Sequence, residues 1–452
     1  MVDPTGLGRR LRVALVPVGF VAGAFLSRIW LWQAPSAYAV DLAQPLVVVT
    51  YWQHFGFLMW IALFVAVTIA SVGYIARLRM TNGTLPLTTL FSALACIAAL
   101  AFPVVFSSDV YAYAGYGWLA LHGASPYAHA AITTRNPLLD AVVWQWGNPP
   151  PVCVYGPAFV WFSEFLVAVL QHLGPSAPLW GFRIAACAAL VLCAPLAYAA
   201  FSERARSAAA AGIALNPIAI WSCAEGHNDI YVIAVVLAGF ALIRRSRAFT
   251  GAALLALSAL VKVPGLIAAG AAAIAYAREA RFGRVISGVI AGTALCALAG
   301  WPALAQLTRD ASQAHYYFPQ FSLQYVFAWL LGDSLGIVLT AVIIATCFVL
   351  GAILAMRRNE NSFLLLALAL WLAIPNPYPW YALWILPLAF IRNGAAQCAI
   401  VALTLGAVLR YLPDSTTDVS SATAVFVALA PLAAAAAVWG LSISAGTRRA
   451  AA

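Results

Sequence analysis

Apolar runs of nearly twenty residues recur along almost the entire chain and are separated by short polar gaps. A helix needs about 20 residues to cross the roughly 30 Å of hydrocarbon in a bilayer. Because lipid offers no hydrogen bonds to exposed backbone, these runs predict helices and exclude open strands. We therefore expect an all-α, polytopic transmembrane protein with about 13–15 membrane segments. The expected spans lie near residues 11–31, 55–75, 86–106, 180–200, 208–222, 230–243, 249–261, 264–277, 285–301, 334–355, 362–375, 380–392, 395–411 and 422–443.

The composition supports a membrane protein and excludes a soluble globular fold. Hydrophobic residues make up 64% of the 452 positions and charged residues 8%, against roughly half and a quarter in soluble domains. The net charge of +10 comes mainly from short gaps such as Arg9 to Arg12, Arg244 to Arg247 and Arg357 to Arg358. Basic gaps of this kind are typical of cytoplasmic loops. We expect the lipid bilayer as a partner, a cytoplasmic N-terminus and no nucleic-acid partner.

The N-terminal apolar run allows two interpretations. It follows basic residues and precedes Ala37 to Ala39, a pattern that a cleaved signal peptide also shows. Arg28, Trp30 and Trp32 lie between the run and that sequence, which favours an uncleaved first span with interfacial anchors.

Orienting the basic gaps toward the cytoplasm places one long segment outside. Residues 107–156 form the longest stretch without a clear span, and loops of this length usually carry function. We expect an interfacial helix through Tyr113 and Leu119 in it. The short apolar segment 157–172, which carries Glu164, is expected not to span, because another crossing there would invert every later basic loop. Other polar segments expected outside are 223–229, 261–265, 302–323 and 375–381.

Ionisable residues near or within membrane spans are candidates for function, because each is costly unless it is paired or solvated. Asp109 directly follows the third predicted span. A carboxylate at the mouth of an outer cavity can accept a proton from an incoming hydroxyl, whereas the same residue can also cap the helix that follows. The full set is Asp109, Glu164, Arg183, Glu225, His227, Asp229 and Lys262.

Three other features each have a functional and a structural interpretation. Lys262 lies beside Pro264 at a break between two short apolar runs, where its ammonium group can meet a lipid-borne phosphate or extend to the headgroups. The turn from Gly226 to Asp229 can bind sugar hydroxyls or cap the next helix. Trp380 and Tyr381 can stack on a sugar face or belong to an interfacial aromatic belt.

Five segments carry a family resemblance: SSDVYAYAGYGWLALHGASPY, VYGPAFVWF, LNPIAIWSCAEGHND, LSALVKVPG and PYPWYALWILPLA. Together and in this order, they resemble the polyprenyl-phosphate-sugar-dependent glycosyltransferases of the GT-C superfamily, and most closely the MptB-like α-(1→6)-mannosyltransferases. The resemblance implies one membrane domain over 1–452. Within it, 1–85 is an extra N-terminal span pair, 86–391 a GT-C-like catalytic region around the outer loop, and 392–452 a set of C-terminal spans.

The resemblance also implies an activity and roles for residues. It implies inverting transfer of a sugar, with mannose expected, from a polyprenyl-phosphate donor to a hydroxyl of a cell-envelope glycan or glycolipid at the outer face of the plasma membrane. Asp109 matches the catalytic carboxylate, Lys262 matches a basic position that meets the donor phosphate, and Arg183 is a second candidate for that phosphate. Candidate substrate-binding residues are Tyr111, Tyr127, Tyr155, His227, Asn228, Asp229, Trp380 and Tyr381.

The sequence predicts neither a cofactor nor a metal. It contains no nucleotide-binding glycine loop, and its eight cysteines lack metal-ligand spacing. Many superfamily members have two acidic residues where this chain has Ser107-Ser108-Asp109, which weakens the case for a bound metal. A secondary transporter is the main alternative, because transporters also use broken helices and sparse intramembrane charges. The lack of an internal repeat and the gathering of polar segments on one side favour the enzyme.

Overall fold

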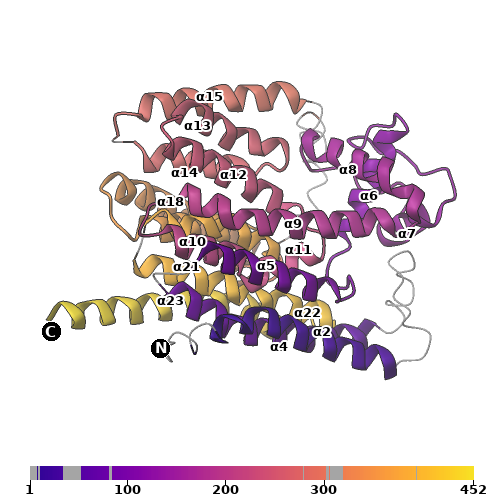
Figure 1. The fold of residues 1–452 in the computed structure, drawn as a ribbon, viewed down its shortest axis with the longest axis horizontal. Helices are drawn as coiled ribbons and strands as arrows, with labels where there is room; N and C mark the ends of the chain where they lie inside the picture. The colour runs from indigo at the N-terminus through magenta and orange to yellow at the C-terminus, as the bar shows by residue number, and fades with distance from the viewer. Residues whose placement is uncertain are drawn as a thin grey trace.

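The computed structural model describes residues 8, 11–33, 52–80, 84–277, 279–301, 305, 319–392 and 394–451. Within these ranges the chain forms helices and irregular segments and no strand, which confirms the predicted all-α class. Most of the helices lie side by side in one bundle, with α2 and α4 on one flank and α15 on the other (Figure 1). Residues 37–39 and most of the predicted polar segment 302–323 lie outside the described residues.

The bundle contains α2 (Leu15–Gln33), α4 (Trp52–Leu78), α5 (Leu85–Leu100), α9 (Ala177–Ala200), α10 (Arg206–Ala214), α11 (Pro217–Ala224), α12 (Asp229–Arg244), α13 (Ala248–Leu257), α14 (Gly265–Ala275), α15 (Phe282–Ala299), α18 (Asp333–Met356), α19 (Ser362–Leu372), α21 (Ala395–Gly406) and α23 (Ser421–Ala451). Shorter elements are α6 (Asp109–Leu121), α7 (Pro137–Trp146), α8 (Pro157–Leu170), α17 (Leu323–Leu331), α20 (Ala382–Ile385), α22 (Tyr411–Thr416) and the 3-10 turns η2 (Gln171–Leu173), η3 (Ser258–Leu260), η5 (Pro379–Tyr381), η6 (Leu386–Phe390) and η7 (Ala407–Arg410).

The lengths of the described helices identify a polytopic membrane protein. Seven of them are long and apolar enough to cross a bilayer, and the bent pair α10–α11 adds an eighth span if it counts as one. Six further apolar helices in the described part of the chain have 10–17 residues. At 1.5 Å of rise per residue, a helix of that length is shorter than the hydrocarbon thickness. Several predicted spans are therefore present as helices that do not make a full crossing alone.

Proline and asparagine residues explain where the spans break. The predicted span 86–106 is too long, because α5 ends at Leu100 and Pro103 disfavours helix at the residue before it. The pair α10–α11 bends by 42°, and the Asn216 side chain at the bend accepts hydrogen bonds from the first N–H groups of α11. Between η3 and α14, the helical path is interrupted at Pro264. The breaks after α5 and before α14 lie near residues of the polar end described below, whereas Asn216 contacts Tyr74 and Thr404 inside the bundle.

The predicted span at 380–392 is wrong as a regular membrane helix. This segment forms three short pieces, η5, α20 and η6, because Pro379 and Pro387 cannot donate the backbone hydrogen bonds of a continuous helix. Most of its side chains are buried. The segment therefore packs inside the bundle and presents Trp380 and Tyr381 to the interior.

The segment 157–172 forms α8 and η2, which pack against α6 and α9. Its length of 17 residues to Leu173 favours the expectation that it does not span. One face of α8 is apolar and open: Trp161, Phe165 and Val169, spaced four residues apart, are 61%, 60% and 52% exposed. Side chains at this spacing share one helix face, so this face is available to lipid.

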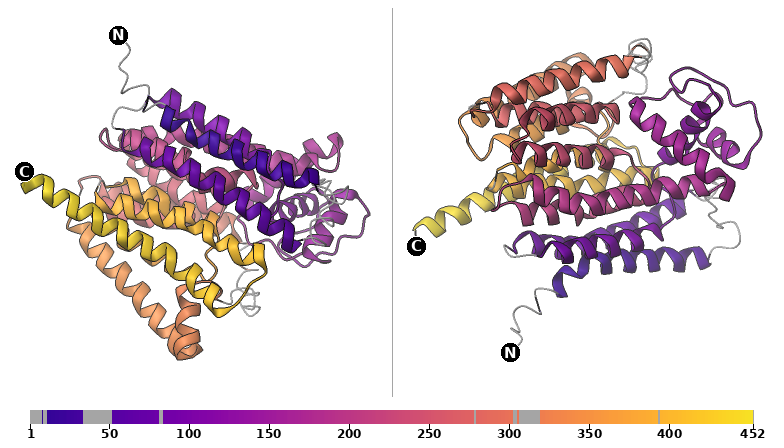
Figure 2. Two further views of the ribbon diagram at one scale, coloured as in Figure 1. Left: turned by 90° about the horizontal axis from the view of Figure 1, so that it is seen from below. Right: turned by 45° about the horizontal axis from the view of Figure 1, so that its top comes forward.

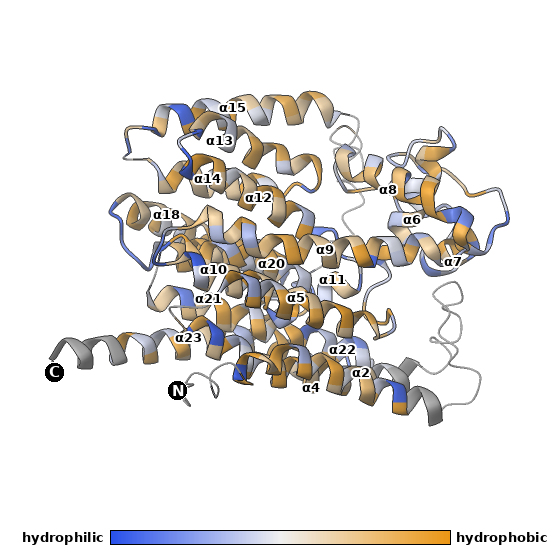
Figure 3. Cartoon of the chain, in the orientation of Figure 1, coloured by the Kyte–Doolittle hydropathy of each residue, from blue (hydrophilic) through white to orange (hydrophobic). Residues whose placement is uncertain are grey.

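The helices α6, α7 and α8 form a group at the end of the bundle where α9 begins (Figures 1 and 2). Apolar residues dominate the long helices, and hydrophilic residues gather mainly near the helix ends and in the connections (Figure 3). On α18, Leu335, Val338 and Val342 are at least half exposed. Large exposed apolar side chains on a spanning helix indicate a surface that faces lipid.

Candidate active site

Asp109 is the first residue of α6, near the start of the long segment 107–156. Its Oδ2 accepts hydrogen bonds from the hydroxyls of Tyr113 (3.2 Å) and Tyr155 (3.4 Å). Ser108 occupies the N-cap position, and α6 has no side-chain capping bond. The capping alternative therefore does not describe Asp109, whose carboxylate instead faces two tyrosine hydroxyls.

The surroundings of Asp109 make its carboxylate a better proton acceptor. Burial raises the pKa of Asp109 above its ordinary value, against the opposing effects of nearby Lys262 and of the hydrogen bonds from Tyr113 and Tyr155. The side chain is nevertheless 19% exposed. A general base works best when its pKa approaches the operating pH and it can still be reached. The upward shift moves the pKa of Asp109 in that direction, and its side chain is accessible.

Lys262 lies at the break between η3 and α14 and is held inside the protein. Its ammonium group donates to Oδ1 of Asp229 (2.9 Å) and to Oδ1 of Asn228 (3.3 Å). Lys262 is 8% exposed and Asp229 is fully buried, so the ammonium group does not extend to lipid headgroups. Asn228 occupies the N-cap position of α12 without a side-chain capping bond. An ammonium group has three N–H donors, and these two contacts leave one for a ligand.

Aromatic rings surround the ammonium group and connect it to Asp109. The Lys262 nitrogen lies 5.3 Å from the ring centres of Tyr155 and Tyr381 and 5.5 Å from that of Trp384, within the range of cation–π attraction. Tyr155 also donates its hydroxyl to Asp109. The predicted base and the predicted phosphate-binding cation therefore touch the same tyrosine.

Tyr155 is positioned by a close approach between two chain segments. The Gly156 N–H donates to the main-chain oxygen of Val261 (3.0 Å), and a Cβ on Gly156 would collide with the main-chain carbonyl of Leu260. Glycine is the residue that permits such a contact. Tyr127 adds a second support by donating its hydroxyl to the main-chain oxygen of Tyr155 (3.1 Å). The end of the segment 107–156 is thereby fixed against the Lys262 break.

His227 lies between two carboxyl groups. Its Nδ1 is 3.6 Å from Oδ2 of Asp109 and its Nε2 is 3.9 Å from Oε2 of Glu225, and neither ring nitrogen has a hydrogen-bond partner. The ring stacks on Trp380 at 3.9 Å between centres. Burial, together with nearby Lys262, lowers the pKa of His227 well below its ordinary value. The imidazole is therefore neutral and offers unused hydrogen-bonding capacity to a ligand.

Glu225 is a buried carboxyl group behind His227. Its Oε1 accepts from the N–H of Phe106 (3.1 Å) and its Oε2 accepts from the hydroxyl of Tyr411 (3.3 Å). Burial raises the pKa of Glu225 to about 8, even though these bonds and Arg183 act to lower it. Glu225 is thus mainly protonated at neutral pH.

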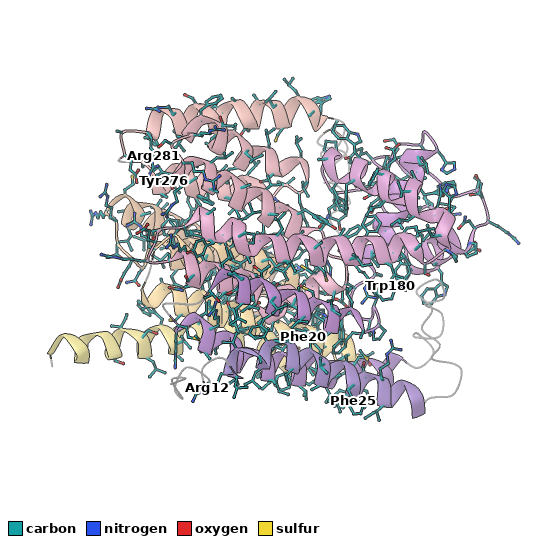
Figure 4. The ribbon with its side chains drawn as sticks, in the orientation of Figure 1. Arg12, Phe20, Phe25, Trp180, Tyr276 and Arg281 are labelled. Atoms are coloured by element: carbon teal, nitrogen blue, oxygen red, sulfur yellow. The ribbon has the colours of Figure 1, made fainter. Side chains whose placement is uncertain are left out.

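Arg183 and Tyr111 do not join this cluster. The Arg183 guanidinium donates to the main-chain oxygens of Ala224, Leu100 (3.1 Å) and Phe102 (2.8 Å) and is 1% exposed. It therefore ties the ends of α5 and α11 together, which corrects its expected contact with a donor phosphate. Its guanidinium also lies over the ring of Trp180, near the start of α9 (Figure 4). Tyr111 is buried in the packing around α6.

Three residues of the cluster were missed from the sequence as members of the site. Tyr113 follows Asp109 by four residues on the same helix, a spacing that places two side chains together. Trp384 donates its Nε1 to Oδ1 of Asp229 (2.6 Å). Glu225 was recognised as ionisable but was given no role. Trp380, expected to stack on a sugar or to lie in an interfacial belt, is 4% exposed and stacked against Tyr378 as well as His227.

The cluster can perform proton transfer and anion binding. A carboxylate with a raised pKa and an ammonium group with a free donor share one aromatic wall, and a neutral imidazole lies beside them. Among the residues that the structure describes, no group of three or more His, Cys, Asp or Glu side chains is arranged to hold a metal ion. A base and a cation arranged in this way can act together on one ligand.

The fold and the site define a polytopic helical membrane protein with a candidate acid–base and anion-binding centre at one end of its bundle. Residues 7–278 match the family model described as "Alpha-(1->6)-mannopyranosyltransferase, N-terminal domain", and the chain belongs to this family.

Two curated relatives carry the name alpha-(1->6)-mannopyranosyltransferase A. The protein from Mycobacterium tuberculosis (strain ATCC 25618 / H37Rv) is 28% identical over 169 residues, which cover 36% of this chain and 32% of the relative. The protein from Corynebacterium glutamicum (strain ATCC 13032) is 28% identical over 181 residues, which cover 38% of this chain and 36% of the relative. The chain thus spans about a third of the length of the curated relatives it matches. No solved structure matches it significantly.

Proposed function

We propose that the protein is an inverting mannosyltransferase that moves mannose from a polyprenyl-phosphate donor to a hydroxyl of a cell-envelope glycan or glycolipid. One observation carries this proposal: Asp109 and Lys262 both contact Tyr155, in a chain that belongs to a mannosyltransferase family. The positive-inside rule places this end of the bundle on the periplasmic or exterior side of the plasma membrane, with the N-terminus in the cytoplasm.

Asp109 acts as the general base in this reaction. Its carboxylate takes the proton of the acceptor hydroxyl while the hydroxyl oxygen attacks the anomeric carbon of the donor sugar. The bond between that carbon and the phosphate oxygen breaks, and its electron pair leaves with the polyprenyl phosphate. Attack opposite the leaving phosphate converts a β-linked donor into an α-linked product. The raised pKa of Asp109 strengthens it as a base.

Lys262 stabilises the phosphate as its charge grows. Asp229 and Asn228 fix two of its three N–H groups, so the third is oriented before the donor binds. Groups held in place in this way stabilise developing charge without reorganising during the reaction. Because Asp229 already balances the ammonium charge, the donor phosphate shares the cation with Asp229.

The surroundings suit the other parts of the donor. A mostly apolar cavity of about 130 Å³ adjoins the site and is lined by Tyr155, Val263 and Leu266, among other residues. Its lining suits the first isoprene units of the polyprenyl chain. The neutral His227 provides hydrogen-bonding capacity for the sugar, and the ring of Tyr381 provides a flat face.

The test is direct transfer by the purified protein. It is incubated with a mannan oligosaccharide acceptor and with labelled polyprenyl-phosphate mannose, arabinose or glucose, or with labelled GDP-mannose in a separate reaction. The product is digested with α- and β-mannosidases. We expect label in an α-mannosidase-sensitive product from the mannose donor. Transfer from GDP-mannose instead, or no transfer from any lipid-linked sugar, would contradict the proposal.

A further inference from the structure

A separate cavity with a partly polar lining lies at the end of the bundle opposite Asp109. It has a volume of about 260 Å³ and is lined by residues near the ends of α9, α12 and α14, before the start of α15, and at 391–392. Tyr276 and Arg281, two of its lining residues, lie at the far end of the bundle from Trp180 (Figure 4). The 24 residues of α9 extend about 36 Å, so the two sites are separated by the length of a membrane span.

Among the residues that the structure describes, three guanidinium groups and one carboxylate line this cavity, so the fixed charge of this lining is positive. The cations are Arg244, Arg281 and Arg392, and the anion is Glu279, which pairs with Arg281 at 2.7 Å. Arginine binds phosphate strongly because its planar group offers several N–H donors to the phosphate oxygens. Two positive charges remain in excess of the single carboxylate.

The arginines also hold the surrounding helix ends, but this does not use all their donors. Arg244 donates through Nη1 to the main-chain oxygen of Phe201, Arg281 through Nη1 to that of Ile243 (3.1 Å), and Arg392 through Nη2 to that of Ala355 (3.1 Å). A guanidinium has five N–H groups. Each arginine therefore has donors beyond these bonds, and their side chains border an open cavity rather than a filled one.

Exposed apolar side chains lie on helices that adjoin these arginines. The helix α15 starts at the residue after Arg281 and exposes Ile290 (64%), and Met356, which follows the Ala355 that Arg392 contacts, is 40% exposed. Anionic headgroups bind basic pockets between membrane helices in this arrangement, with the acyl chains along the apolar helix surface.

We propose that this cavity binds the phosphate group of an anionic phospholipid at the arginine-rich end of the protein. The site is independent of the transfer site and of the transfer reaction. Its function is to anchor one lipid molecule between the helix ends that Arg244, Arg281 and Arg392 already hold together.

The test uses the full-length protein in detergent, with native mass spectrometry to count bound lipid during titration with phosphatidylglycerol or phosphatidylcholine. We expect the wild type to retain phosphatidylglycerol in preference to phosphatidylcholine. The double variant Arg244→Gln/Arg392→Gln should bind it on the order of 30-fold more weakly, from two lost arginine–phosphate contacts. The control Arg79→Gln/Arg245→Gln removes the same charge from exposed arginines outside the cavity lining and should retain the lipid.

Two further measurements keep the result decisive. Glu279→Gln removes the one carboxylate and should tighten phosphatidylglycerol binding, which tests the site even if the arginine variant fails to fold by size-exclusion chromatography. Inorganic phosphate at millimolar concentration should not displace the lipid. The proposal would be overturned if the wild type retained the two lipids equally or if the control variant lost phosphatidylglycerol as readily as the arginine variant. It would also be overturned if Glu279→Gln bound the lipid more weakly or if free phosphate displaced it.

Discussion

Substitutions at the buried ion pair between Lys262 and Asp229 can distinguish its contribution to stability from the contribution of Lys262 to catalysis. The two groups are 2.9 Å apart, and their side chains are 10% and 0% exposed. Removing one partner of such a pair leaves an uncompensated buried charge, which costs about 3–5 kcal/mol. We therefore expect Lys262→Met and Asp229→Asn each to destabilise the protein by about that amount.

The double variant should regain most of the lost stability. With Lys262→Met and Asp229→Asn together, no charge is left unpaired, and the Asn oxygen can still accept the Trp384 indole hydrogen bond that Asp229 accepts at 2.6 Å. The coupling energy between the two substitutions should exceed about 2 kcal/mol. Yet the double variant should not use the donor, because it lacks the ammonium group.

Equilibrium unfolding in mixed detergent micelles, followed by tryptophan fluorescence, measures the four free energies of this cycle. Sugar transfer is measured on the same preparations. Additive losses of stability would refute the pairing, since independent sites add. A stable double variant with wild-type dependence on donor concentration would refute the role of Lys262 in binding the phosphate.

Three other outcomes follow from the site. The rate of transfer should fall as the pH drops through the raised pKa of Asp109, with a midpoint above the ordinary carboxyl pKa of about 4. Tyr155→Phe should move this midpoint upward, because the variant lacks one hydrogen bond to the carboxylate. An unchanged midpoint would contradict this effect of Tyr155. Because the pKa of Glu225 is raised from 4.5 to about 8, wild type should lose stability relative to Glu225→Gln as the pH rises from about 4.5 to about 8, with no further loss above that range, in parallel melting curves. Gly156→Ala should lower the unfolding free energy by about 1–3 kcal/mol, since its Cβ meets the main chain at Leu260, and unchanged stability would show that the segment can shift.

Much of the fold could be predicted because every backbone N–H and C=O group inside a bilayer must be hydrogen-bonded within the protein. Long apolar runs predicted helices, and proline residues located several breaks, including the one beside Lys262. The ends of the spans were less predictable. α5 stops six residues before the predicted end at 106, and the segment that begins at Pro379 is irregular.

The site was predictable as a gathering of segments and not as a set of contacts. Counting the predicted spans is enough to place Asp109, the turn containing His227 and the Lys262 break at one end of the bundle, because successive spans cross in alternating directions. Which partners those side chains have depends on how each helix is rotated and packed. The sequence pattern therefore could not show that Asp229 pairs with Lys262, or that Arg183 bonds to main-chain carbonyls.

The role of Asp109 is tested most directly by a single substitution with a matched control. Asp109→Asn keeps the shape of the side chain and removes the base, whereas Asp140→Asn makes the same change at an exposed carboxylate on α7. In transfer assays with polyprenyl-phosphate mannose, we expect Asp109→Asn to lose at least about 100-fold in rate and Asp140→Asn to match the wild type, at equal amounts of folded protein. Transfer by Asp109→Asn within a few-fold of the wild type would contradict the assignment of Asp109 as the base.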